Sequence, residues 1–378
     1  MDKHGEASGS LISGHNLRRR SQINRPRNSV YLYDMDSSND TEREDEDYLN
    51  AVVQSLDMQP TQKTKKACDI LQEKYGLRFN EGGELRDFIS NAPFDFNIYR
   101  EKDKNQKRYD ELAKVITHHV YDLLEDEGKL IREVVPRDGT DTEARTCIFR
   151  SRDFFTCETL VVLIHGAGWV RAGQWSTRLI INASLESGSQ LPYIQKCHEL
   201  GYGVLVLNTN ANLDSGVPIR GNSTPEDHFE YIWNKFVLKA CAMNVAVVAH
   251  SRGGEVILGA GRKIPSVRDK TFAVALTDSV HANTYGDDRF VSWVKNCACN
   301  WVRSSEDIDH PLDSADDCCR LSAGTLSHEE TSWKAFTSVW KFIQSKLDAI
   351  NELNAKKRKL INCAGEVDDN DDMGFGLF

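Results

Sequence analysis

A serine stands directly after an apolar run in the segment VAVVAHSRGGEVIL, residues 245–258. The run predicts a buried strand and residues 254–262 predict a helix, which places Ser251 in the turn between them. Small residues surround the serine, as in the nucleophile elbow G-x-S-x-G, although Ala249 occupies the position of the first glycine. The segment predicts a nucleophilic serine close to a helix N-terminus, which favours developing negative charge. A serine that only caps the helix is the alternative.

A glycine-rich loop follows another apolar strand in LVVLIHGAGWVRAGQW, residues 160–175. We expect the backbone N–H groups of Ala167 and Gly168, together with that of Arg252, to form an oxyanion hole. A tight turn that simply needs glycine is the alternative. The G-x-G-x-x-G spacing of dinucleotide-binding loops is absent, so no such cofactor is expected. Arg171 and Trp175 come next and are candidates for the mouth of the site.

The catalytic histidine and the carboxylate that orients it are expected downstream of Ser251, because α/β-hydrolases carry their triad in the order Ser, acid, His. His328 lies between a short predicted strand and the last helix, where the catalytic histidine of this fold belongs, and His281 is the rival. For the acid, Asp278 follows a clear strand, and Glu306 follows the weaker strand that precedes the histidine. The sequence leaves both carboxylates open, and either could instead cap a helix.

The elements that must position these residues alternate between strand and helix from residue 130 onward. Strands are predicted at 131–135, 146–151, 159–164, 203–208, 245–249, 272–277 and, more weakly, 299–302. Helices are predicted at 191–200, 225–242, 254–262, 289–296 and 331–347. Continuous apolar strands that alternate with helices predict a mostly parallel sheet with helices on both faces. The expected fold class is α/β, of the α/β-hydrolase type.

Charge and composition divide the chain into three parts. Residues 1–60 are expected to form a disordered charged arm, since a basic cluster at residues 15–27 precedes an acidic one at residues 34–47. Residues 64–350 are expected to form the hydrolase-like domain, with a hairpin and helix extension at 64–128. Residues 354–378 are expected to be a disordered tail that begins with a basic run. Both basic clusters are candidates for nuclear import.

The bulk composition excludes several classes of protein. The chain has 47 basic and 57 acidic residues, a net charge of −10, so direct nucleic-acid binding is not expected. The start of the sequence has no apolar signal segment, and the longest apolar run is too short to cross a membrane. The ten cysteines are therefore expected to be reduced thiols. The pairs Cys297/Cys299 and Cys318/Cys319 lack C-x-x-C spacing, so neither a metal nor a cofactor is expected.

Several long segments also resemble a known family. VVLIHGAGWVRAGQWSTRLIIN, VAHSRGG, AVALTDSVH, CNWVRSSE and SAGTLSHEETSWKAF are similar to the Argonaute-binding protein two domain. They resemble more closely the cotranscriptional regulators called family with sequence similarity 172, over roughly residues 75–347. The resemblance implies an α/β-hydrolase fold with a possible nucleophile at Ser251. It also implies Argonaute, splicing and chromatin partners, a part in RNA silencing or alternative splicing, and a place in the nucleus and cytoplasm. Family members differ at Arg252, so only the backbone role of that residue carries over.

Two functions remain open at the level of sequence. The first is a serine hydrolase that cleaves an ester, thioester or amide, with Ser251, His328 and either Asp278 or Glu306 as its triad. The second is a catalytically inactive scaffold that binds Argonaute or splicing and chromatin proteins. A fold does not decide between them, because related folds carry both kinds of function.

Overall fold

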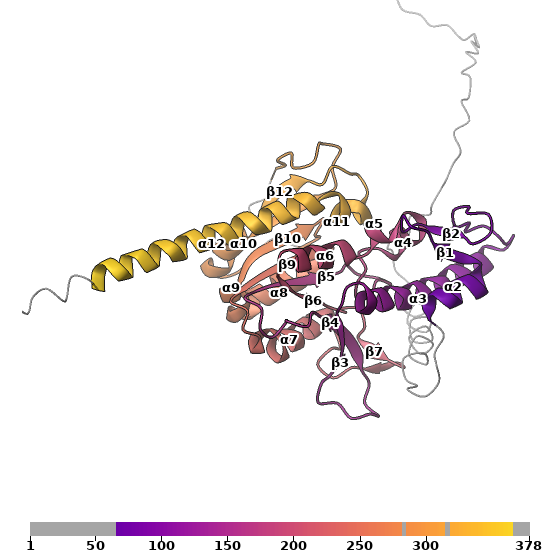
Figure 1. Cartoon of the computed structure of the whole chain (residues 1–378), viewed down its shortest axis with the longest axis horizontal. Helices are drawn as coiled ribbons and strands as arrows, with labels where there is room; N and C mark the ends of the chain where they lie inside the picture. Colours follow the sequence, from indigo (N-terminus) through magenta and orange to yellow (C-terminus); the bar gives the residue numbers. More distant parts are fainter. Residues whose placement is uncertain (1–65, 282–284, 314–317, 366–378) are drawn as a thin grey trace, which may run out of the picture. The chain divides into compact units, whose positions relative to one another are not determined.

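The computed structural model describes residues 66–281, 285–313 and 318–365, with side chains as far as residue 358 (Figure 1). The predicted arm at 1–60 and the end of the predicted tail lie outside these residues. The main feature is an eight-stranded sheet. Its strands are β3 (Ile131–Val135), β4 (Thr146–Arg150), β5 (Thr159–Ile164), β6 (Gly203–Val206), β9 (Asn244–His250), β10 (Thr271–Thr277), β11 (Ala298–Val302) and β12 (Cys319–Ser322).

The strand order is β12-β11-β10-β9-β5-β6-β4-β3. The strands from β12 to β6 are mutually parallel, and β4 and β3 join antiparallel at one edge. The chain passes from β5 to β6 on one side and later returns to β9 on the other side of β5. The carboxyl ends of β5 and β9 therefore flank a switch point, where open α/β sheets commonly bind their ligands.

Two hydrophobic cores cover the two faces of the sheet. Alternate residues of one strand face opposite sides, so Val161 and Leu163 of β5 enter one core, and Leu160 and Val162 enter the other. The first core is packed by α3 (Lys102–Asp126), α4 (Thr177–Asn182), α6 (Leu191–Glu199) and α12 (Phe336–Gly365). The second is packed by α7 (Pro225–Lys235), α8 (Gly253–Lys263) and α10 (Asp288–Cys297). The fold is α/β-hydrolase-like, as the alternation of strands and helices predicted.

An N-terminal extension precedes the sheet. It consists of α2 (Ala67–Tyr75), the hairpin β1 (Leu77–Phe79) and β2 (Leu85–Asp87), and α3. Helix α3 packs closely on the segment after the glycine-rich loop: a Cβ at Gly173 would lie 2.8 Å from side-chain carbons of both Val120 and Leu124. The extension therefore supports the chain that leads away from the candidate site.

Several elements differ from the sequence prediction. Helix α7 ends at Lys235 and is followed by a short 3-10 turn, η1 (Val237–Lys239), so the helix predicted to residue 242 is too long. The last helix instead continues to Gly365. Residues 354–365, expected to belong to a disordered tail, are helical because their lysine, leucine and alanine residues favour helix whatever their net charge. The short elements α5 (Leu185–Gly188), β7 (Leu213–Asp214) and β8 (Val217–Pro218) were not predicted. Of the helices in the described ranges, none is both long and apolar enough to cross a membrane.

Candidate active site

Ser251 lies in the turn between β9 and α8 with a backbone φ of 51°. Its amide donates to the carbonyl of Thr277 (3.0 Å), and its carbonyl accepts from Gly254 (3.1 Å). A left-handed conformation is uncommon for a residue with a side chain and tends to occur at functional sites. Gly253 follows the serine by two residues, and a glycine is needed there because the backbone lies close to the end of β5. A Cβ at Gly253 would lie 2.8 Å from the carbonyl oxygen of Ile164.

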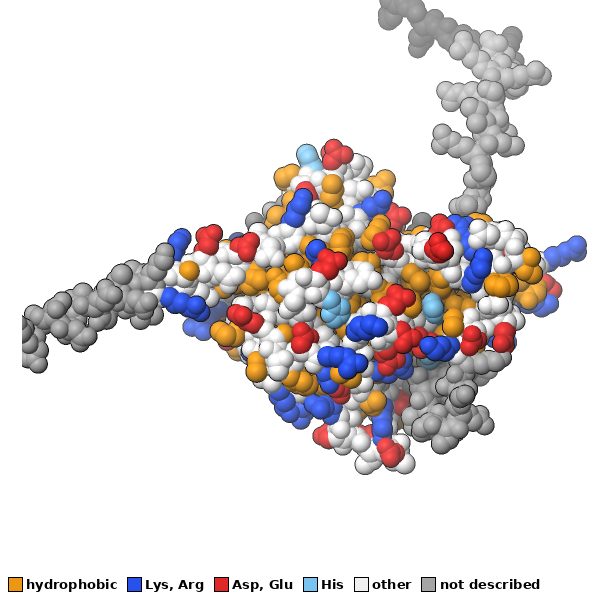
Figure 2. Space-filling view, viewed as in Figure 1, with side chains coloured by type: hydrophobic (Ala, Val, Ile, Leu, Met, Phe, Trp, Pro, Cys, Tyr) orange, Lys and Arg blue, Asp and Glu red, His pale blue; other side chains and the backbone are white. Residues whose placement is uncertain are grey.

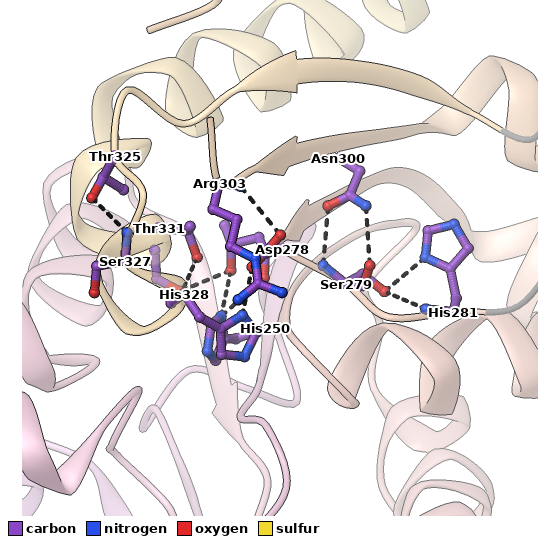
Figure 3. Close-up of polar contacts among 12 residues, drawn as sticks. His250, Asp278, Ser279, His281, Asn300, Arg303, Thr325, Ser327, His328 and Thr331 are labelled. Atoms are coloured by element: carbon purple, nitrogen blue, oxygen red, sulfur yellow. Dashed lines mark hydrogen bonds and ion pairs between the residues drawn. The ribbon is translucent and has the colours of Figure 1, made fainter. Parts of the chain in front are cut away.

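Asp278 follows β10 directly, and it also has a positive φ, 49°. Its Oδ2 lies 2.5 Å from Nδ1 of His328, and its Oδ1 accepts from the backbone amide of Arg303 at 3.2 Å (Figure 3). The Arg303 guanidinium lies 3.5 Å from the same Oδ2. Burial by itself would raise the pKa of Asp278, but these hydrogen bonds and charges lower the pKa below its usual value. The carboxylate is therefore ionised at neutral pH and orients the imidazole of His328.

His250, which directly precedes Ser251, connects the serine turn to His328 by a contact between their rings. The His250 ring lies 4.7 Å from the His328 ring, centroid to centroid, and its Nδ1 lies 2.9 Å from the carbonyl oxygen of Thr277 (Figure 3). The side chain of Ser251 is half-buried. Among the described residues, the Ser251 hydroxyl has no hydrogen-bond partner, and neither does Nε2 of His328.

The glycine-rich loop lies against the serine. A Cβ at Gly166 would be 3.0 Å from the Cβ of Ser251 and 3.5 Å from its Oγ. Ala167 and Gly168 are exposed, and Gly168 has a φ of 94°. Within the described ranges, the backbone N–H groups of Ala167, Gly168 and Arg252 donate to no other residue. These three amides are therefore available to a ligand oxygen, as an oxyanion hole requires.

Asn210 is a residue of this site that the sequence analysis missed. Its Nδ2 lies 2.9 Å from the carbonyl oxygen of Gly166, 3.0 Å from that of Gly168 and 3.2 Å from that of Val170. One side chain thus holds three carbonyls of the glycine-rich loop, and the intervening N–H groups are left free. Its position in the sequence could have identified it. Asn210 follows β6, and the carboxyl ends of β6, β5 and β9 lie at the same edge of the sheet.

Three other candidates from the sequence do not contact the His328–Asp278 pair in the described structure. The Glu306 side chain is exposed and makes no contact with His328 in the described structure. His281 instead contacts Ser279, whose Oγ is 2.7 Å from its Nδ1 (Figure 3). Trp175 was expected near the mouth, but it is 2 % exposed and packs edge-on against both Tyr193 and His250. It is therefore buried next to the site and does not line a mouth.

Three buried histidines, His165, His228 and His250, lie near the carboxyl ends of the central strands. Desolvation lowers the pKa of His165 to about 4 and lowers those of His228 and His250 to about 3. All three are neutral at physiological pH. In the described part of the chain, no group of three or more His, Cys, Asp or Glu side chains is arranged to hold a metal ion.

A strand order centred on β5 and β9, helices on both faces and a serine turn at the switch point define an α/β-hydrolase-like protein. Within that class, the Arb2 domain profile matches residues 71–216 and 213–308. The chain belongs to the Arb2 domain family.

Relatives matched over most of their length agree with this assignment. The Cotranscriptional regulator ARB2A homolog of Xenopus tropicalis is 40 % identical over 342 residues, covering 74 % of this chain and 80 % of the relative. The Cotranscriptional regulator ARB2A of Homo sapiens is 38 % identical over 339 residues, covering 73 % and 80 %. A FAM172 family protein homolog of Caenorhabditis elegans is 32 % identical over 306 residues, covering 79 % and 95 %.

Solved structures resemble the chain more distantly. A histone deacetylase from Saccharomyces cerevisiae aligns with a TM-score of 0.45 and 15 % identity, covering 62 % of this chain and 97 % of that one. Est1E from Butyrivibrio proteoclasticus aligns with a TM-score of 0.35 and 12 % identity, covering 57 % and 99 %.

Proposed function

We propose that this Arb2-family protein is a serine hydrolase that cleaves an acyl bond in an ester, thioester or amide. The hydrogen bond between Asp278 and His328 carries the proposal, because it joins two residues that are 50 positions apart in the chain and leaves Nε2 of the imidazole free. His250, the residue before Ser251, packs its ring against that of His328, so the turn that carries Ser251 lies near this imidazole. The positive φ of Ser251 is the second support, since a nucleophile elbow requires it.

The proposed reaction assigns a role to each of these groups. Nε2 of His328 accepts the proton as Oγ of Ser251 attacks the acyl carbon, and Asp278 stabilises the imidazolium that forms. The amides of Arg252 and of Ala167 or Gly168 bind the oxyanion. His328 then protonates the leaving group, and the acyl group stays on Ser251. A water molecule, deprotonated by the same imidazole, releases the acid and restores the serine.

An active-site fluorophosphonate probe tests the proposal, because it forms a covalent bond only with an activated serine. Folded wild-type protein should be labelled, and Ser251→Ala should lose the label. Ser279→Ala is the matched control, since Ser279 also contacts a histidine, and it should remain labelled. Folded wild-type protein that stays unlabelled, or label that disappears only in Ser279→Ala, would overturn the assignment.

The biological setting follows from the relatives, which carry the name cotranscriptional regulator. The protein acts in the nucleus on this proposal, with Argonaute, splicing or chromatin proteins as partners. A protein partner fits the surface better than nucleic acid does, because basic and acidic side chains are mixed over the face in Figure 2 and the net charge is −10. Co-purification from nuclear extract, with the full chain and with residues 1–60 deleted, tests the partners and the part played by the arm.

A catalytically inactive scaffold is the second candidate. One observation favours it: the Ser251 hydroxyl makes no hydrogen bond among the described residues, so no contact activates it in this state. Partner capture that is equal for wild type and Ser251→Ala, combined with no probe labelling, would support the scaffold.

A further inference from the structure

We propose that Cys299 and Cys319 form a reversible disulfide when the protein meets a two-electron oxidant such as hydrogen peroxide. Cys299 lies in β11 and Cys319 opens β12, and the two are direct cross-strand partners in parallel register. The site is independent of the proposed hydrolase activity.

The usual spacing of paired strands permits such a bond between cross-strand partners. Neighbouring strands of a sheet lie about 4.8 Å apart, and the Cα atoms of bonded cysteines lie roughly 4.4–6.8 Å apart. Strand β12 is at the edge of the sheet, and Cys319 is its first residue, so this thiol can shift without disturbing strands on both sides.

Exposure assigns different roles to the two thiols. Cys319 is exposed, whereas Cys299 is 3 % exposed, and burial raises the pKa of the Cys299 thiol. The thiolate of Cys319 therefore reaches the oxidant first. It attacks one peroxide oxygen and becomes a sulfenic acid, while the other oxygen leaves as water. The sulfur of Cys299 then attacks that sulfur, loses its proton and releases a second water. In total, two thiols are oxidised to one disulfide, and one peroxide is reduced to two waters.

The neighbouring cysteine provides the geometric contrast. Successive side chains of a strand point to opposite faces, and Cys299 belongs to one hydrophobic core, whereas Cys318 belongs to the other. Cys318 is therefore the wrong partner for Cys299, although it precedes Cys319 directly. The bond would tie the edge strand to β11, and the chain continues from that edge strand to His328.

The full reduced protein, treated with hydrogen peroxide and then alkylated, tests the inference by mass spectrometry. The expected product has lost two hydrogens, contains a Cys299–Cys319 cross-link in its peptide map, and returns to the starting mass with dithiothreitol. Cys319→Ser should abolish the cross-link, and Cys318→Ser should keep it. Cys68→Ser is a matched control, because Cys68 is exposed and contacts Asp69 rather than a thiol, and it should also keep the cross-link.

The wild-type peptide map decides the matter even if a variant fails to fold. A cross-link through Cys318 or Cys297 would overturn the proposal. So would a Cys319 that proceeds to sulfinic acid while Cys299 stays free to alkylate.

Discussion

Asp278 and Ser251 share a backbone conformation that is uncommon for residues with side chains, and each follows the carboxyl end of a buried strand. Each position turns the chain sharply and lifts the side chain above the edge of the sheet. Backbone hydrogen bonds to neighbouring strands hold these strained turns in place. The amide of Ser251 donates to the carbonyl of Thr277, and the amide of Asp278 donates to that of Trp301.

We expect Asp278→Asn to reduce the rate of fluorophosphonate labelling by on the order of 10³-fold or more, because a neutral amide cannot stabilise the imidazolium or hold its tautomer. Glu306→Gln makes the same chemical change on an exposed carboxylate without a contact to His328, and it should label at the wild-type rate. Labelling rates of the two folded variants provide the comparison. The reverse result would identify Glu306 as the acid.

Asn210→Asp tests whether the glycine-rich loop is held by its amide. The new carboxylate cannot donate and repels the three carbonyls, so the loop moves and labelling slows by roughly 10²-fold. Asn212→Asp is the control, since Asn212 donates to the carbonyl of Asn222 in the same segment, away from the loop. Equal labelling of both variants would show that Asn210 does not position the oxyanion amides.

At the scale of elements, helix α8 begins where the serine turn ends, and its first residue touches the end of β5. A Cβ at Gly253 would lie 2.8 Å from two backbone oxygens, those of Ile164 and His165, whereas a Cβ at Gly259 of the same helix would meet nothing within 4 Å. The contact joins the two strands that flank the switch point.

Gly253→Ala should therefore lower the free energy of unfolding by about 1–3 kcal/mol, because backbone atoms must move to admit the methyl group. Gly259→Ala should raise it by about 0.5–1 kcal/mol, since alanine loses less conformational entropy in a helix and here fills open space. Urea unfolding of the two variants measures the difference, and an equal effect of both substitutions would contradict the close approach at Gly253.

At the scale of the whole molecule, the three neutral histidines make stability depend on pH. Their pKa values in the folded protein are about 4 for His165 and about 3 for His228 and His250. An unfolded histidine titrates near 6.5, so below that pH the unfolded chain binds protons that the folded chain excludes. Stability is therefore unaffected by these groups above pH 6.5 and decreases as the pH falls toward 4.

The free energy of unfolding should decrease by up to about 1.4 kcal/mol per pH unit for each of these histidines. Urea unfolding between pH 7 and pH 4.5 measures the slope. His228→Gln keeps an acceptor for the amide of Asn208 and removes one titrating group. The unfolding free energy of this variant should therefore fall less steeply with decreasing pH, by up to about 1.4 kcal/mol per pH unit. An unchanged slope would show that His228 is not excluded from protonation.

Much of the architecture was predictable because it depends on local pattern. Buried parallel strands have to be continuously apolar, and so β5, β9 and β10 were placed within one residue of their ends. The extent of the last helix was harder to predict, since a charged, low-complexity composition does not distinguish a solvated helix from a disordered tail. The short elements α5, β7 and β8 were missed because so few residues carry no periodicity.

The sequence by itself determined the alternation of strands and helices, the turn at Ser251 and the glycine-rich loop, because apolar period and turn glycines are properties of neighbouring residues. Only the tertiary structure decided that Asp278 rather than Glu306 contacts His328, that Asn210 holds the loop, and that Cys299 lies opposite Cys319. These contacts join residues distant in the chain, and they depend on strand order and register, which no local pattern encodes.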